Sequence, residues 1–245
     1  MDLPEFEQAL NDKKIDFLII NPQEYILLES LFGVSRVATL VKRDNDQIVN
    51  RFAGVIFTRS DRHDISALQD IKGKRLAAVD RLSFAGYSLQ RKLLLDHDID
   101  IERDTQLQLL GFPQDLNVHA VLEGKADVGF VRSGLLEAMQ HEGKIDLKQI
   151  RIIHPVSSTD FPFLRSTDLY PEWAFAAAKG IPIDITNRVV SALLQLPPGS
   201  EPANAARYYR WSTPMNYESV ENLMRALHIR PFDQPEKIQL HDVAR

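Results

Sequence analysis

Two short segments near the ends of predicted strands hold the residues best suited to binding chemistry. The first, Ser83-Phe84-Ala85-Gly86-Tyr87, comes after the predicted strand 75–79 and opens the predicted helix 83–97. Free backbone N–H groups and the helix dipole, about half a charge, attract an anion at such a turn. Gly86 lets the backbone approach a ligand closely, and the Ser83 hydroxyl adds a donor. The competing interpretation is an ordinary helix cap.

The second segment is Arg132-Ser133, which directly follows the apolar run 126–131. The planar fork of an arginine holds carboxylate, sulfonate or phosphate groups through two hydrogen bonds. A surface salt bridge explains Arg132 equally well. Asn21 and Tyr25 stand at a matching point, between the apolar run 15–20 and the next helical pattern, and they offer polar and aromatic contacts.

Other candidates carry weaker signals. Arg59 follows the predicted strand 52–58, where it either faces a ligand or pairs with Asp61 or Asp64. Trp211 is expected in the core. Four more side chains lie in loops or crossovers that could line a cleft, although packing is the favoured interpretation of the last two: Phe112, Gln114, Tyr170 and Trp173.

The usual signatures of catalysis and metal binding are absent from the sequence. There is no cysteine, and the seven histidines do not give the H-E-x-x-H spacing. The sequence also has no G-x-S-x-G, P-loop or G-x-G-x-x-G motif. The formal net charge of −5 argues against nucleic acid as a partner. We therefore expect no metal, no cofactor and no catalytic residue, although catalytic residues need not be adjacent in sequence.

The elements that must position these residues follow an alternating pattern. Hydrophobic residues make up 44% and charged residues 26% of 245 residues, as in a globular protein with a sizeable core. Predicted strands alternate with helices, which indicates α/β architecture with parallel sheets. We predict two lobes, residues 1–59 with 160–245 and residues 60–159, with a ligand cleft at the carboxyl ends of the strands.

Three segments carry a family resemblance. Residues 70–79 with 83–87, and Val121-Leu122-Glu123-Gly124-Lys125-Ala126-Asp127-Val128-Gly129-Phe130-Val131, resemble the second lobe of the phosphonate-type periplasmic binding proteins. Residues 166–175 resemble the sensor domains of two-component histidine kinases related to the tetrathionate sensor. The resemblance covers nearly the whole chain. It implies a two-lobed type II periplasmic-binding fold with a small ligand in the interlobe cleft.

The resemblance also shapes the expected ligand and site. Phosphonate transporters tend to carry an acidic residue near Arg132, so an arginine there favours a more anionic ligand. The expected ligand-binding set is Asn21, Tyr25, Arg59, Ser83, Phe84, Ala85, Gly86, Tyr87, Arg132, Ser133 and Tyr170.

One family feature is missing from the sequence. Members begin with a strand, a helix and a second strand before the helix that opens this chain. Its absence indicates a piece of a longer protein or a start codon placed too far downstream. It also predicts an unpaired sheet edge beside 15–20, through which two copies could form a homodimer.

The favoured function is ligand sensing for a histidine kinase in the periplasm, with membrane attachment only through segments outside this chain. No apolar run reaches the roughly 18 residues needed to span a bilayer, and no signal peptide is visible. The alternatives are a transporter's solute receptor for phosphonate-like or sulfur oxyanions, and an enzyme on the same fold, such as a thiamine-precursor synthase.

Overall fold

The first lobe is built on a five-stranded sheet in the computed structural model, which describes residues 3–44 and 46–234. Its strand order is β1-β11-β2-β12, with β3 paired to β2. The strands are β1 (Phe17–Ile20), β2 (Ser35–Asp44), β3 (Gln47–Val49), β11 (Ala174–Ala177) and β12 (Arg210–Ser212).

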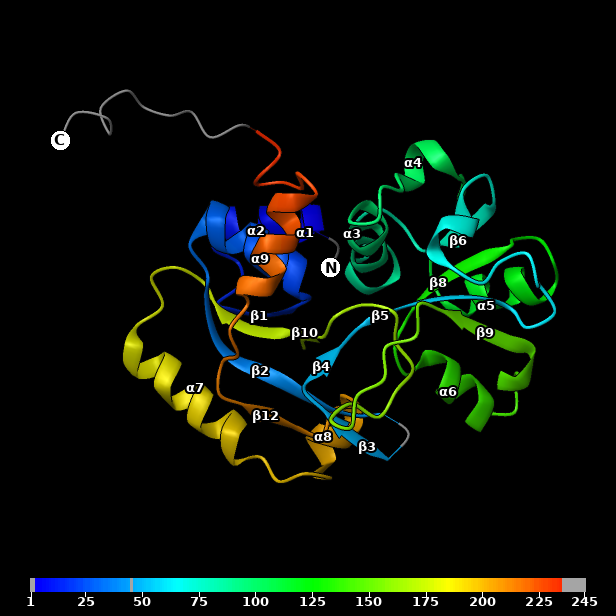
Figure 1. Cartoon of the computed structure of the whole chain (residues 1–245). Coiled ribbons are helices and arrows are strands. Elements are labelled where there is room, and N and C mark those ends of the chain that lie inside the picture. Colours follow the sequence, from blue (N-terminus) through cyan, green and yellow to red (C-terminus); the bar gives the residue numbers. More distant parts are fainter. Residues whose placement is uncertain (1–2, 45, 235–245) are drawn as a thin grey trace.

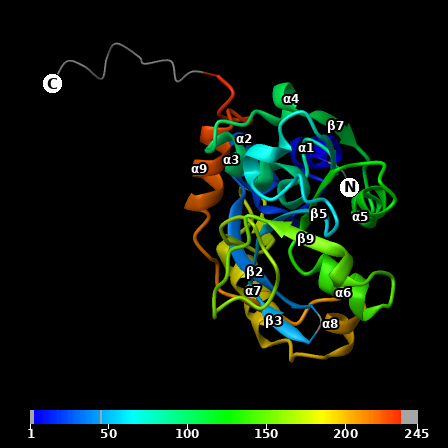
Figure 2. The same ribbon diagram turned by 45° about the vertical axis from the view of Figure 1, so that its right-hand side comes forward.

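Helices cover both faces of this sheet (Figures 1 and 2). Helices α1 (Leu3–Asn11), α2 (Pro22–Phe32) and α9 (Glu218–Ala226) lie on one side, and α7 (Ile183–Gln195) lies on the other. The short helix α8 (Glu201–Ala205) precedes β12. Helix α2 has clear end signals: the Asn21 side chain accepts from the Glu24 N–H at 3.0 Å, and Gly33 ends the helix with a φ of 66°.

The second lobe has its own five-stranded sheet, in the order β7-β6-β8-β5-β9. The strands are β5 (Gly54–Arg59), β6 (Arg75–Ala78), β7 (Gln106–Leu109), β8 (Val128–Arg132) and β9 (Ile150–Ile153). A π-helical turn (Phe84–Ser88) runs directly into α3 (Leu89–Leu95). The remaining helices are α4 (Ile101–Asp104), α5 (Asp115–Leu122) and α6 (Leu135–His141), with short 3-10 turns at Leu68–Ile71 and Leu147–Gln149. Separate hydrophobic clusters pack this lobe around its sheet.

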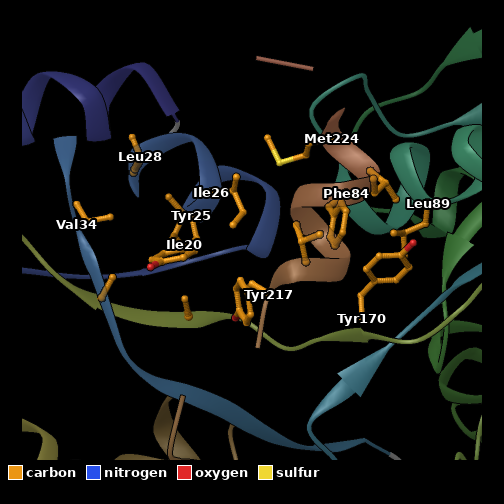
Figure 3. Close-up of a cluster of buried hydrophobic side chains, with 14 of the residues drawn as sticks. Ile20, Tyr25, Ile26, Leu28, Val34, Phe84, Leu89, Tyr170, Tyr217 and Met224 are labelled. Carbon is orange, nitrogen blue, oxygen red and sulfur yellow. The ribbon is translucent and has the colours of Figure 1, made fainter. Parts of the chain in front are cut away.

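Two crossovers join the lobes and pair with each other. Strand β4 (Arg51–Phe52) carries the chain into lobe two, and β10 (Tyr170–Pro171) brings it back, with Tyr170 opposite Phe52. A single hydrophobic cluster spans this junction (Figure 3). It contains Tyr25 and Tyr217 from lobe one and Phe84 from lobe two. The lobes therefore share packed side chains as well as two chain connections.

Several predictions about the sheets need correction. The pairs of the first sheet are all antiparallel among the described strands, because β11 returns from lobe two and inserts between β1 and β2 against their direction. Strand β5 pairs with β8 and β9, so the lobe boundary falls before Gly54 and not after residue 59. In the second sheet, only β6 pairs in parallel, with β7 and β8.

Two further segments and a buried tryptophan complete the first sheet. Residues 204–211 contain the end of α8 and the start of strand β12. Residues 36–42 lie in β2, which pairs with β3, and Asn45 between the two strands lies outside the described residues. Trp211 is buried, as expected.

The predicted edge is present at β1. This strand pairs only with β11 among the described residues, and the Ile19 side chain is 46% exposed, so the strand is not buried on both faces. Association of two copies through β1 stays a prediction.

Candidate functional site

A cavity of about 710 Å³ lies between the lobes. Its wall combines lobe one, the two crossovers and the loops that follow strands β6, β7 and β8 of lobe two. The lining residues are Leu3, Pro4, Asn21, Glu24, Phe52, Asp80, Leu82, Ser83, Phe84, Ala85, Phe112, Gln114, Arg132 and Trp173. The cavity is therefore located at the carboxyl ends of strands, as the sequence predicted.

The turn at Ser83 forms one wall and offers unused donors. Ser83 caps the helix by accepting the Gly86 N–H at 3.2 Å. The N–H groups of Phe84 and Ala85 meet no protein acceptor among the described residues. The run Phe84–Leu95 is helical throughout, so these N–H groups lie at the positive end of its dipole. This arrangement can bind an anion.

Aromatic packing fixes the position of this turn. The Phe84 ring makes edge-to-face contacts with Phe52 at 5.8 Å and with Tyr170 at 5.3 Å between ring centroids. Gly86 is required by close packing, since a Cβ there would lie 2.4 Å from Cγ2 of Val79. Gly86 and Tyr170 thus support the turn from behind and do not line the main cavity.

Arg132 lines the cavity from the end of β8 and forms an ion pair. Its guanidinium donates to Glu172, which follows β10, and it lies 4.7 Å from the centre of the Phe52 ring. The Glu172 side chain is fully buried, whereas 19% of the Arg132 side chain is exposed. Nε of Arg132 and Oε2 of Glu172 have no partner in the described part of the chain. Burial raises the pKa of Glu172, and the charge of Arg132 opposes this effect.

Polar and acidic groups from both lobes also line the cavity. Asn21 and Glu24 come from the start of α2, and Asp80 comes from the loop before the Ser83 turn. Asp80 accepts the Leu82 N–H at 2.7 Å, and Gln114 accepts the Arg132 N–H at 2.9 Å. Trp173 is 40% exposed and lines the cavity, although the sequence favoured packing for it.

Some predicted site residues lie in the core near the cavity. Tyr25 is buried, donates to Glu29 at 2.5 Å, and lies edge-to-face with Tyr217. Tyr87 is buried and donates to Glu102. Ser133 is buried and accepts the Ala53 N–H at 3.0 Å, which ties β8 to the first crossover.

Arg59 is far from the cavity, because β5 runs antiparallel to β8. Arg59 therefore lies at the opposite end of the sheet from Arg132. Its Nε donates to Asp61 at 2.8 Å, which agrees with the pairing alternative.

Three acidic residues at the site escaped the sequence reasoning. Glu24 lies one helical turn after Asn21. Asp80 lies in the loop before Ser83. The expectation that ligand-binding residues lie near the ends of strands therefore pointed close to both. Glu172 had no such signal, since it lies in a short irregular link between β10 and β11.

No cluster of three or more potential metal-ligating side chains occurs in the described ranges. The helices within these ranges are also too short or too polar to cross a membrane.

Comparison with known proteins identifies the family to which this fold belongs. A family model described as the periplasmic substrate-binding protein of phosphonate ABC transporters matches residues 1–232. The chain belongs to this family. Its members are periplasmic binding proteins, so membership indicates an extracytoplasmic location for the chain. The predicted two-lobed type II fold is confirmed.

A curated relative connects the chain with signalling. The tetrathionate sensor histidine kinase TtrS of Salmonella typhimurium is 34% identical over 232 residues, which cover 94% of this chain and 38% of TtrS. The chain therefore spans well under half the length of this relative. The likeness supports a ligand-sensing domain, as the sequence resemblance implied.

Solved structures share the fold. XAC2383 from Xanthomonas citri bound to ATP has a TM-score of 0.69 and 19% identity, covering 92% of this chain and 81% of its own. PhnD1 from Prochlorococcus marinus (MIT 9301) in complex with methylphosphonate has a TM-score of 0.68 and 14% identity, covering 93% and 84%. At these identities the likeness establishes the fold alone.

Proposed function

We propose that this chain is the extracytoplasmic ligand-sensing domain of a membrane-anchored histidine kinase and that it binds a small anion between its lobes. The observation that carries the proposal is the 34% identity to a sensor kinase over 94% of the chain. The cavity lies where a ligand can contact both lobes and both crossovers.

The anion part of the proposal rests on the Ser83 turn. Two unused backbone donors, a helix dipole and the Ser83 hydroxyl converge on one wall of the cavity. Arg132 adds a cation across from Phe52. Sulfur and phosphorus oxyanions, including tetrathionate, match these donors because several oxygens can accept at once.

Lobe closure would transmit the binding event. A cavity of about 710 Å³ has room for roughly 24 water molecules at about 30 Å³ each, so a small anion leaves most of it to solvent. Contacts made only when the lobes approach each other would favour a closed state. In a kinase, such closure would pass to segments outside this chain.

A thermal-shift panel with a charge variant tests the proposal. We expect tetrathionate, sulfate or methylphosphonate to raise the melting temperature of the wild type. Ala85→Glu places a carboxylate beside the two free N–H groups and is expected to abolish the shift. Ala85→Gln has nearly the same size without the charge, so it should keep most of the shift. If no anion stabilises the wild type, or if both variants behave alike, anion binding at this turn is wrong.

A transporter's solute receptor is the second candidate, supported by the family description and by the PhnD1-like fold. The complete gene separates the two functions. A transmembrane segment and a kinase in the same reading frame support the sensor, and a stop codon beside transporter genes supports the receptor.

A further inference from the structure

The Arg132–Glu172 pair is incompletely satisfied and lies at the border between cavity and core. Glu172 uses one carboxylate oxygen on Arg132 and leaves Oε2 without a partner in the described residues. Arg132 lines the cavity, and its Nε is likewise unused. A buried carboxylate with a free oxygen is costly unless it is strongly paired.

The other groups around Glu172 cannot replace Arg132. Lys42 and Asp44 of β2 are the remaining charged groups that act on this carboxylate, and they pair with each other at 3.2 Å. The Tyr217 hydroxyl donates to the backbone oxygen of Glu172 and not to its side chain. Only the Trp173 N–H adds a backbone donor that favours the charged form. Arg132 is therefore the main counter-ion of Glu172.

An anion in the cavity competes with Glu172 for this counter-ion. The guanidinium can turn its donors toward the ligand, and Glu172 cannot follow because its side chain is fully buried beneath the cavity wall. A carboxylate left alone in that position would carry an uncompensated buried charge. Protonation removes this charge.

We propose that Glu172 competes with the anion for Arg132. When the anion binds, Arg132 moves from Glu172 to the ligand, and Glu172 takes up one proton from solvent. The inference rests on the proposed anion binding. It makes Glu172 a specificity-determining residue, because the bound anion must outcompete a carboxylate that is already in place. Anion binding then becomes tighter as the pH falls.

The sign of the effect follows from the charges around the carboxyl group. Burial raises the pKa of Glu172 in the free protein, and the charge of Arg132 holds it down. Transfer of Arg132 to the ligand removes the lowering influence, so the pKa of Glu172 rises further. Between these two pKa values the complex holds one more proton than the free protein, and Kd rises by up to about tenfold per pH unit.

Calorimetric titration tests this coupling without any substitution. Sulfate and tetrathionate are suitable probes because neither changes its own charge between pH 5.5 and 8.5. We expect Kd to increase with pH over this range. Repeating the titration in two buffers of different ionisation enthalpy should show uptake of up to one proton per bound anion.

Two variants test whether Glu172 is the group that takes up the proton. Glu172→Gln should bind the same anion with a Kd that no longer depends on pH, and it should bind more tightly than the wild type at pH 8.5. Glu137→Gln is the matched control, since Glu137 is a half-buried carboxyl on α6 whose pKa is also raised by burial and whose Oε2 is also unpartnered within the described residues. This control should keep the wild-type pH dependence.

The outcomes separate the inference from the function. Absence of binding by either anion at any pH overturns anion binding of these probes and the inference with it. Binding with a pH-independent Kd, as when the anion uses only Nε and leaves the Glu172 bond intact, overturns the inference alone. So does a pH dependence that survives in Glu172→Gln.

Discussion

Strand β8 has an arginine–carboxylate cluster at each end, and the two clusters differ in how well they are satisfied. At the start of β8, Asp127 accepts from the N–H, Nε and Nη2 of Arg75 at 3.0, 3.0 and 2.8 Å, and also from Arg62. At the other end, Glu172 accepts from Arg132 with one oxygen and leaves the second unpartnered among the described residues.

The pKa directions follow this difference. The Arg75 hydrogen bonds lower the pKa of Asp127 more strongly than partial burial raises it. Burial raises the pKa of Glu172 despite Arg132. The satisfied cluster lies away from the cavity and stabilises lobe two, whereas the unsatisfied one borders the cavity. Unsatisfied buried groups of this kind are typical of functional sites.

The largest expected effect comes from breaking the satisfied cluster. Asp127→Ala should lower the free energy of unfolding by about 3–5 kcal/mol, because it removes four hydrogen bonds to one carboxylate at once, three of them from two partly exposed guanidinium groups. Urea denaturation measures this loss. Asp61→Ala is the control, since Asp61 pairs with Arg59 at the surface, where solvent screening leaves such a pair little effect on stability. Equal effects in the two variants would contradict the comparison.

A smaller, pH-dependent loss is expected for Arg132→Met. This change leaves Glu172 without its main counter-ion, so its raised pKa rises further. A raised carboxyl pKa contributes stability at low pH that is lost as the pH increases. The variant should therefore lose about 2–3 kcal/mol relative to the wild type at pH 8 and clearly less at pH 5. A loss that is the same at both pH values would show that Glu172 does not titrate.

The smallest expected effect is a change in how steeply the free energy of unfolding declines at acid pH. The lowered pKa of Asp127 contributes stability above its ordinary value of 3.8 that is lost as the pH falls through the folded-state pKa. Asp127→Asn removes this titration and should flatten the decline below pH 4 by at most about 1.4 kcal/mol per pH unit. Thermal unfolding between pH 2.5 and 5 tests this. An unchanged slope would assign the acid sensitivity to other carboxylates.

Much of the fold was predictable because buried strands leave apolar runs. The runs at 75–79 and 126–131 contain β6 and most of β8, and the turn after each one lines the cavity. Strand direction was not predictable in the same way. Both lobes receive a strand that arrives across a crossover, and sequence patterns do not tell that β5 and β11 run against their neighbours. The misplacement of Arg59 follows from this.

The site was predictable in part for a similar reason. Asn21 directly follows β1, Arg132 is the last residue of β8, and Ser83 begins the turn after the short loop that follows β6, so one rule about strand ends found all three. Tyr25 and Tyr87 are one helical turn further on and point into the core, where each donates to a glutamate. Glu172 lies on an irregular link, and only the three-dimensional fold brings it to Arg132.

A crystal structure of the chain soaked with tetrathionate tests the central claim most directly. Anomalous scattering from sulfur locates the ligand independently of the protein map. We predict sulfur density in the interlobe cavity, with ligand oxygens within hydrogen-bond distance of the N–H groups of Phe84 and Ala85. Density elsewhere, or an empty cavity at a concentration that stabilises the protein in solution, would contradict the assignment of this turn as the anion site.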